Sequence, residues 1–377
     1  MNPLLSNRIR FFNLLAMLLL VVIHSFNIQG GTMNAATIMQ VPANFTNITE
    51  YFLANGLFRF RIPLLMMISG YLLAYKFDGN ILLLYKKKAK SLLIPYILVN
   101  TLTLMYVAII EFIWFKNQVT GFWGEHKVWE YNWFEWFYRL VLSPIPFQLW
   151  YLRVLFIFIL LYPALSFLLK KWPIYLLTIL LVWRLTFTGS HFSLLIYFTT
   201  GIYFFQQSTN LIKKPRNISL LLAAFVVFIS ISLKTLIAFH ILHFHPVLEK
   251  YSLQVLQTIH AIFTCYVVWF SCDVLIEKLK DKTWYKAAVS ASFVIYAFHE
   301  PLTIKLIPMG LDLFSSFPLP ELWAFLTLPI FVVLVCMILD KLVFKAFPNF
   351  YSLLTGKRGL KKLPSEKTNA SPILVAN

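Results

Sequence analysis

The sequence predicts an all-α fold, a polytopic transmembrane helical bundle of about ten spans with the N- and C-termini in the cytoplasm. Of the 377 residues, 59% are hydrophobic and only 13% are charged, whereas soluble domains contain about 45–50% apolar and about 25% charged residues. Apolar runs long enough to cross a bilayer recur along the chain. The density of basic residues also alternates from one connecting segment to the next.

Ten segments are candidate spans when the chain is scanned in windows of about 19 residues. They lie near residues 11–28, 52–75, 91–114, 148–168, 173–187, 192–206, 219–239, 257–276, 288–307 and 322–344. The fifth and sixth are short and could instead form a re-entrant hairpin around Gly189. Because these two come as a pair, either choice leaves the sidedness of the other connections unchanged.

The basic residues define the predicted orientation. One alternating set of segments contains 23 lysines and arginines and the other set only four, Lys116, Lys127, Arg139 and Lys250. This is the positive-inside pattern, and it places both termini in the cytoplasm. The net charge of +18 is therefore explained by orientation, and no nucleic-acid partner is expected.

The chain is expected to form one transmembrane domain, residues 1–350, followed by a basic, flexible cytoplasmic tail, residues 351–377. An alternative for the first span is a cleavable signal peptide ending near residues 34–36, although its apolar run is longer than a usual signal core. The three cysteines form no redox or zinc motif.

Several ionisable residues fall inside the predicted spans. An ionisable side chain at mid-membrane costs roughly 2.5–3.5 kcal/mol, so it is expected to face a cavity or a partner. Six such residues from four spans are predicted at similar depth in the outer half of the membrane: His24, Arg59, Arg61, Arg153, His299 and Glu300. Arg184, Lys234 and Lys305 are interpreted instead as long side chains that extend to the headgroups.

A histidine cluster, His240-x-x-His243-x-His245, has spacing that brings imidazoles together. It lies at the end of a span, Pro246 follows directly, and no acidic residue intervenes. We therefore interpret it as a polar interfacial rim, with metal binding as the less favoured alternative, and predict no metal site.

Trp129, Trp133 and Trp136 follow i, i+4, i+7 spacing within the connection from about 116 to 147. This spacing predicts one apolar stripe on a helix, which favours a helix lying flat on the membrane surface. Stacking of a sugar on the tryptophans is the alternative.

Five segments, in order, resemble those of the membrane acyltransferase-3 family. They are residues 8–25 with His24 at the end of the apolar run, residues 58–64 leading into Ser-Gly-Tyr-Leu-Leu at 69–73, residues 87–96, residues 149–153, and residues 295–302. The resemblance covers residues 8 to about 345. It implies transfer of an acyl group, commonly acetyl, from cytoplasmic acyl-CoA to a hydroxyl of an envelope carbohydrate or lipid-linked glycan in the bacterial cytoplasmic membrane, without a bound cofactor.

The resemblance also suggests roles for residues. His24 is the expected general base, with an acyl-histidine relay as an alternative, and Arg59 or Arg61 would stabilise the oxyanion of the tetrahedral intermediate. The residues expected to bind the acceptor are Ser69, Trp150, Tyr151, Arg153, His299 and Glu300. His299 would orient the acceptor or pair with Glu300.

The acyl-CoA is expected to meet Arg10, Lys87 and Lys90, where the lysines attract its phosphates. The family usually has a basic residue eleven positions before the histidine, where this chain has Asn13. Arg10 lies one turn away near the same helical face and is expected to substitute for it. Lys87 and Lys90 stand where the family has a basic pair, and lysine lacks the bidentate fork of arginine.

Two other functions are compatible with polar groups buried in a membrane protein. A transporter or flippase would line its substrate path with them, but the sequence shows no pair of related halves. A non-catalytic scaffold with a degenerate site is the second alternative, and Asn13 is its main support. Consumption of a thioester by the purified protein separates an enzyme from both.

Overall fold

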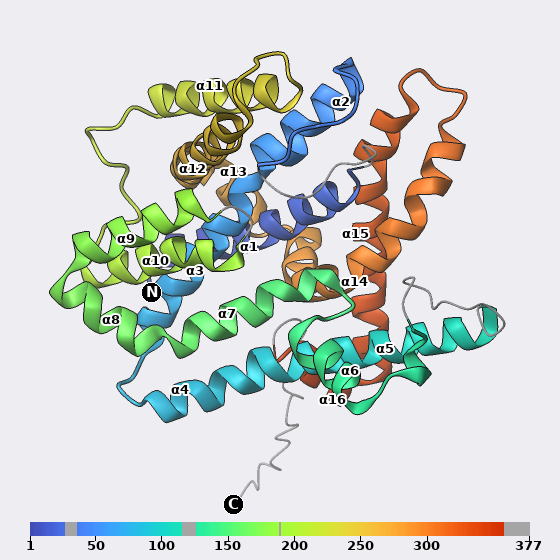
Figure 1. The fold of residues 1–377 in the computed structure, drawn as a ribbon. Helices are drawn as coiled ribbons and strands as arrows, with labels where there is room; N and C mark the ends of the chain where they lie inside the picture. Colours follow the sequence, from blue (N-terminus) through green and yellow to red (C-terminus); the bar gives the residue numbers. More distant parts are fainter. Residues whose placement is uncertain (27–35, 115–125, 188–189, 358–377) are drawn as a thin grey trace, which may run out of the picture.

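The computed structural model describes residues 1–26, 36–114, 126–187 and 190–357, except for the side chains of residues 114, 301, 304 and 305. Within these residues the chain is helical and contains no β-strand (Figure 1). The N-terminal part comprises α1 (Pro3–His24), α2 (Phe45–Glu50), the π-helical η1 (Tyr51–Gly56), the 3-10 helix η2 (Leu57–Phe60), α3 (Arg61–Lys76), α4 (Ile81–Lys88), η3 (Ala89–Leu93) and α5 (Ile94–Trp114).

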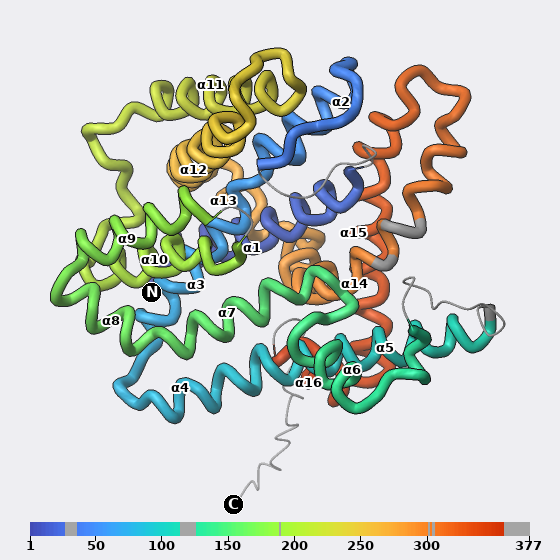
Figure 2. The backbone as a smooth tube through the Cα atoms, in the orientation of Figure 1, coloured from blue at the N-terminus to red at the C-terminus, as the bar shows by residue number. Residues whose placement is uncertain are grey.

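The middle of the chain contains short helices, and the C-terminal part contains the longest helices. The middle contains η4 (Val128–Glu130), α6 (Trp133–Phe137), η5 (Tyr138–Leu142), η6 (Phe147–Leu149), α7 (Trp150–Leu160), α8 (Tyr162–Lys171), α9 (Pro173–Thr186), η7 (His191–Leu194) and α10 (Leu195–Gln206). The C-terminal part contains α11 (Leu220–Ala238), α12 (Pro246–Ser271), α13 (Asp273–Leu279), α14 (Thr283–Leu313), α15 (Pro320–Ala346) and α16 (Pro348–Leu354). Figure 2 shows α14 and α15 as a long hairpin along one side of the molecule.

Six helical segments among the described residues are long and apolar enough to cross a membrane: Pro3–His24, Phe45–Lys76, Ile81–Ile113, Leu220–Ala238, Pro246–Ser271 and Pro320–Ala346. A seventh results if Trp133–Leu142 and Phe147–Leu160, bent by 66°, form one broken span. These helices agree with the predicted polytopic bundle. The count of about ten spans and the cytoplasmic termini remain predictions.

The second predicted span, residues 52–75, is interrupted. The chain passes from the π-helical turn of η1 through η2 into α3, with φ −92° and ψ −101° at Gly56. A Cβ at Gly56 would lie 2.5 Å from Cγ2 of Ile231 on α11, so glycine permits the close approach of the two segments. Irregular backbone at membrane depth is tolerated where protein or a cavity surrounds it. The interruption places Arg59 and Arg61 at the start of α3, beside a cavity.

The helices α3 and α10 cross in close contact, and each contains one glycine at the contact. A Cβ at Gly70 would lie 2.0 Å from the carbonyl oxygen of Phe198, and one at Gly201 would lie 2.0 Å from that of Met67. Small residues let helix backbones approach in this way in membrane proteins. The short fifth and sixth predicted spans correspond to the helices α9 and α10, of which α10 is packed tightly against α3, and their crossing of the membrane remains a prediction. Gly189, the centre of the alternative hairpin, lies outside the described residues.

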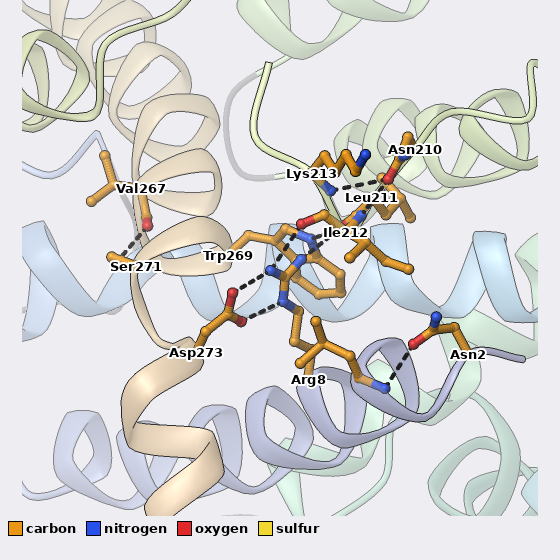
Figure 3. Close-up of polar contacts among 11 residues, drawn as sticks. Asn2, Arg8, Asn210, Leu211, Ile212, Lys213, Val267, Trp269, Ser271 and Asp273 are labelled. Atoms are coloured by element: carbon orange, nitrogen blue, oxygen red, sulfur yellow. Dashed lines mark hydrogen bonds and ion pairs between the residues drawn. The ribbon is translucent and has the colours of Figure 1, made fainter. Parts of the chain in front are cut away.

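Arg8 holds the first turns of α1 in place, as Figure 3 shows. Its Nε and Nη2 donate to the two carboxylate oxygens of Asp273 at 2.7 and 2.6 Å. Its Nη1 and Nη2 also donate to the carbonyls of Leu211 and Ile212 at 2.5 and 3.1 Å. Arg8 is only 1% exposed. The sequence interpretation counted it among the basic residues outside the spans and missed this structural role.

The structure differs from the sequence predictions for the tryptophan stripe and for the start of the C-terminal tail. The tryptophan stripe on a single helix is wrong, because Trp129 lies in η4, apart from the short α6, while Trp136 packs on Tyr131. At the C-terminal end, packed structure extends beyond residue 350. Tyr351 of α16 is buried and its hydroxyl donates to Asp340 Oδ1 at 2.8 Å. Residues 358–377, most of the predicted tail, lie outside the described residues.

Candidate active site

A cavity of about 300 Å³ lies among α1, α3, α7, α9, α12 and α14, and we call it the active-site cavity. Its polar and aromatic lining residues are His24, Arg59, Arg61, Gln148, Trp150, Tyr151, Arg184, Ser190, His191, Ser193, Gln254, Gln257 and Tyr296. These side chains come from segments far apart in the sequence. The cavity therefore exists only when the whole bundle is assembled.

His24 is the last residue of α1 and is half-buried in the cavity wall. Its ring contacts His299 of α14 edge to face, with the centroids 4.9 Å apart. His299 Nδ1 lies 2.8 Å from the carbonyl oxygen of Ile295, so this nitrogen carries the proton and donates it. His299 Nε2 then keeps its lone pair, and no described residue hydrogen-bonds to it. His299 is fully buried and lies behind His24, outside the cavity lining.

Arg59 and Arg61 lie on the same wall and interact electrostatically with His24. Arg59 Nε donates to Asn55 Oδ1 at 2.8 Å, which fixes its direction. Arg61 is 5% exposed, and its Nη1 reaches the carbonyl of Phe58 at 3.4 Å. Its Nε has no hydrogen-bond partner among the described residues. An arginine with donors to spare therefore stands beside a histidine that has an open cavity face.

Two more cations lie near this wall, and the expectation that they extend to the headgroups is wrong. Arg184 lines the cavity and is 8% exposed, while Lys234 is 1% exposed and does not line the cavity. Arg184 Nη1 donates to Ser193 Oγ at 2.8 Å. Lys234 Nζ donates to the carbonyl of Asn55 at 2.5 Å and to Gln257 Oε1 at 2.6 Å. The side chain of Lys305 lies outside the described residues.

Aromatic side chains also line the cavity, and we call this part of the lining the aromatic wall. Trp150 stacks on His191 with the centroids 4.2 Å apart and an interplanar angle of 20°. Tyr296 donates its hydroxyl proton to the carbonyl of Gln148 at 2.7 Å, and Gln148 Nε2 donates to the carbonyl of Ala297 at 2.9 Å. These bonds join η6 to α14 and hold Trp150 and Tyr151 against the cavity. A wall of flat rings with polar edges is suited to binding a sugar.

Comparison with known proteins identifies the family. The model of the acyltransferase-3 family, described as an acyltransferase domain, matches residues 9–341. This chain belongs to the acyltransferase-3 family. It is 24% identical over 329 residues to the succinoglycan biosynthesis protein ExoH of Rhizobium meliloti (strain 1021), a match that covers 84% of each chain. No solved structure matches the chain. The family confirms the predicted resemblance and makes the protein a multi-pass membrane acyltransferase.

Four residues expected to bind the acceptor lie outside the lining of the cavity: His299, described above, and Ser69, Arg153 and Glu300. Ser69 Oγ is 3.5 Å from the hydroxyl of Tyr151, so it contacts a lining residue. Arg153 follows the lining residues Trp150 and Tyr151 on α7 and interacts electrostatically with His191. Glu300 accepts a hydrogen bond from the backbone N–H of Phe147. These contacts support the aromatic wall, and the expected pairing of Glu300 with His299 is replaced by bonds of each residue to backbone.

The residues expected to bind acyl-CoA lie away from the cavity. Arg10 is exposed near the start of α1 and interacts electrostatically with Tyr285. Lys87 and Lys90 are exposed on α4 and η3, and Lys87 Nζ pairs with Asp78 Oδ2 at 3.1 Å. None of the three lines the cavity. Their role in binding the donor remains a prediction of the family resemblance.

The lining also contains residues that were not predicted from the sequence, among them Gln148, His191, Gln254 and Gln257. Gln254 Nε2 donates to the carbonyl of Arg184 at 2.7 Å, so the two glutamines of α12 hold Arg184 and Lys234 in place. A signal was present, since two amides three residues apart in an apolar helix face the same side. Only ionisable residues inside the spans were predicted to face a cavity, so the two glutamines were not among the expected site residues.

The histidine cluster after α11 has an acidic partner that the motif did not include. Glu249 Oε1 lies 3.4 Å from His240 Nδ1 and accepts a hydrogen bond from the backbone N–H of Phe244 at 3.1 Å. The ligand atoms of His240, His243 and Glu249 all lie within 4.8 Å of one another, and His245 is not part of this group. The predicted absence of a metal site is not tested by this geometry.

Proposed function

We propose that this protein is a membrane O-acyltransferase that transfers an acyl group, acetyl being the first to test, from cytoplasmic acyl-CoA to a hydroxyl of an envelope saccharide or lipid-linked glycan in the bacterial cytoplasmic membrane. The observation that carries the proposal is the juxtaposition of His24 and Arg61 on one wall of the active-site cavity. The similarity to a protein named for succinoglycan biosynthesis supports a glycan acceptor.

In this mechanism His24 is the general base. A neutral imidazole takes the proton of the acceptor hydroxyl as its oxygen attacks the thioester carbonyl. The carbonyl oxygen becomes an oxyanion, and Arg61, assisted by Arg59, donates hydrogen bonds to it. The intermediate then collapses, the carbon–sulfur bond breaks, and the thiol of CoA leaves with the proton returned from His24.

His299 is proposed to position His24. Its Nδ1–H is occupied by the carbonyl of Ile295, and its ring meets the ring of His24 edge to face. It therefore restricts the orientation of His24 and offers a lone pair, on Nε2, toward the imidazolium that forms during transfer. A histidine whose neighbour fixes its orientation is a more effective base.

The aromatic wall is the proposed acceptor site. Trp150, held by its stack on His191, and Tyr151 present flat surfaces to the cavity, and the acceptor sugar ring would lie against them. Arg153, Ser69 and Glu300 act on this wall from behind through the contacts described above. The phosphates of the donor would dock on Lys87, Lys90 and Arg10, whose charges attract a polyanion.

The decisive experiment measures acyl transfer in membranes that contain equal amounts of the folded chain. His24→Ala is expected to lower the rate by about 10²–10⁴-fold because it removes the general base. Arg61→Gln is expected to lower it by about 10²–10³-fold because it removes an oxyanion donor. His243→Ala, which changes an exposed histidine outside the cavity, is the matched control and should transfer at the normal rate.

Normal turnover by a well-folded His24→Ala variant would remove the assignment of the base. If label from acetyl-CoA reaches no acceptor while intact glycan crosses the bilayer, the protein is a transporter. Mass spectrometry of envelope glycans with and without the protein, searching for a lost acyl mass, would identify the acceptor.

A further inference from the structure

Arg184 and Lys234 are buried cations whose hydrogen-bond acceptors are all neutral. Arg184 donates to the hydroxyl of Ser193, and Lys234 donates to a backbone carbonyl and an amide oxygen. Within the described part of the chain, no carboxylate lies within ion-pair distance of either side chain. Arg8 shows the contrast, because its guanidinium is equally buried and forms a two-pronged pair with Asp273.

The buried cations also repel one another. Lys234 interacts electrostatically with Arg59 and Arg184, and Arg59 interacts with both Arg184 and Arg61. A buried charge without a counter-charge is costly, and buried charges in proteins are normally paired or hydrogen-bonded to an ion. A bound anion would therefore balance the charges of Arg184 and Lys234, whose hydrogen-bond acceptors are neutral.

The geometry of Arg184 fits this interpretation. Its side chain lines the active-site cavity and its Nη1 is used by Ser193, but its Nε has no hydrogen-bond partner among the described residues. Gln254 donates a hydrogen bond to the backbone carbonyl of Arg184. Lys234 interacts electrostatically with Arg184 and donates a hydrogen bond to Gln257, which also lines the cavity. A planar guanidinium with unused donors binds carboxylates and phosphates.

We propose that Arg184, supported by the charge of Lys234, binds an anionic group, a carboxylate or phosphate, of the substrate that enters the active-site cavity. This inference rests on the proposed function and narrows its substrate class. The cavity of about 300 Å³ is shared with His24, so the anionic group belongs to the part of the substrate near the reacting hydroxyl. It comes either from an acidic acceptor or from an acyl group that itself ends in a carboxylate.

The first test measures binding without any transfer. The unfolding temperature of the purified full chain in detergent is followed against inorganic phosphate and against glucuronate at constant ionic strength, with glucose as the neutral probe. We expect saturable stabilisation by at least one anion and none by glucose. Arg184→Gln should weaken the anion affinity at least about tenfold, whereas Arg184→Lys should retain part of it. Arg216→Gln, which removes an exposed charge, should bind like the wild type.

Each variant's unfolding temperature without anion serves as its own baseline, so a folding defect is separated from a loss of binding. Absence of any anion effect in the wild type, or an equal effect in Arg184→Gln, overturns the inference. If anions bind through Arg184 but no acyl transfer occurs, the site stands and the proposed function fails. If acyl transfer occurs but no anion binds through Arg184, the proposed function stands and the anion site fails.

A second test distinguishes the two sources of the anion. Transfer from acetyl-CoA is compared with transfer from succinyl-CoA, and acidic acceptor glycans are compared with neutral ones. A preference for succinyl-CoA or for acidic acceptors supports the site if Arg184→Gln loses that preference and Arg216→Gln keeps it. The preference that is found identifies which substrate carries the charge. If the transfer rate depends neither on the charge of the acyl group nor on the charge of the acceptor glycan, the proposal is overturned.

Discussion

At the scale of single residues, the protein buries positive charge in two different ways. Arg8 is balanced by Asp273 and by two carbonyls, so it serves the fold. Arg184 and Lys234 face neutral acceptors around a cavity, so they serve a ligand. The presence or absence of an acidic partner thus distinguishes Arg8 from Arg184 and Lys234, a distinction that the sequence alone did not give.

Asp273→Asn should destabilise the protein. The substitution keeps the shape of the side chain but leaves the guanidinium of Arg8 buried without its counter-charge, and a hydrogen bond to a charged group contributes about 1.5–3 kcal/mol. Thermal unfolding in detergent measures the loss. Asp281→Asn, which alters an exposed acid on the next connection, is the control, and equal unfolding temperatures for the two variants would contradict the structural role of the pair.

His299→Leu should slow acyl transfer while leaving acceptor binding nearly unchanged. Leucine fills the buried space but cannot hold the ring of His24 in one orientation, and a misplaced catalytic group costs about 10²-fold. Kinetic measurement should therefore show a lower kcat with a similar KM for the acceptor. An increase confined to KM would show instead that His299 binds the acceptor directly.

At the scale of elements, the sequence predicted the helices well where hydrophobicity decides them and poorly where the backbone is irregular. The candidate spans near 219–239 and 322–344 correspond closely to α11 and α15. The run at 52–75 did not reveal the break at Gly56, because that break depends on the approach of Ile231 from a distant helix. The helix predicted from the tryptophan spacing at 129–136 was also wrong. The spacing does not reveal that the chain here forms two separate short helices, η4 and α6.

Gly201→Ala should separate α3 from α10. The added Cβ would lie 2.0 Å from the carbonyl oxygen of Met67, and backbone cannot move aside as a side chain can. Overpacking of this kind costs about 1–3 kcal/mol or more, and the unfolding temperature should fall accordingly. Gly310→Ala is the matched control because it meets only the flexible end of Leu328. Similar stability losses in both variants would argue against a tight α3–α10 contact.

At the scale of the whole molecule, the sequence predicted the candidate site in part. His24, Arg59, Arg61, Trp150 and Tyr151 do line one cavity, because depth along each span could be counted from the charged segments. The sequence does not show which side chains face the cavity, because the rotation of each helix about its axis is set by the helices packed against it. For this reason Arg184 was misjudged and Gln254 and Gln257 were missed.

The predicted orientation can be tested on the intact protein. Because basic residues concentrate on alternate connections, both termini should face the cytoplasm. A C-terminal fluorescent-protein fusion should therefore fluoresce, while alkaline phosphatase at the same place should be inactive. Insertion of the phosphatase at the exposed residue His243 should give the opposite pair of results. Active phosphatase at the C-terminus would reverse the assigned sides of the cavity.

The long-range partners of α1 impose an order on biogenesis. The ribosome makes this helix well before its partners, because Asp273, which pairs with Arg8, and His299, which contacts His24, are synthesised 265 and 275 residues later. Early in synthesis α1 can thus be inserted into the membrane but cannot form its contacts with Asp273 and His299. Nascent chains stalled before residue 273 should consequently remain vulnerable to membrane quality-control proteases, and two co-expressed halves should regain activity only by reuniting the beginning of the polypeptide with its end.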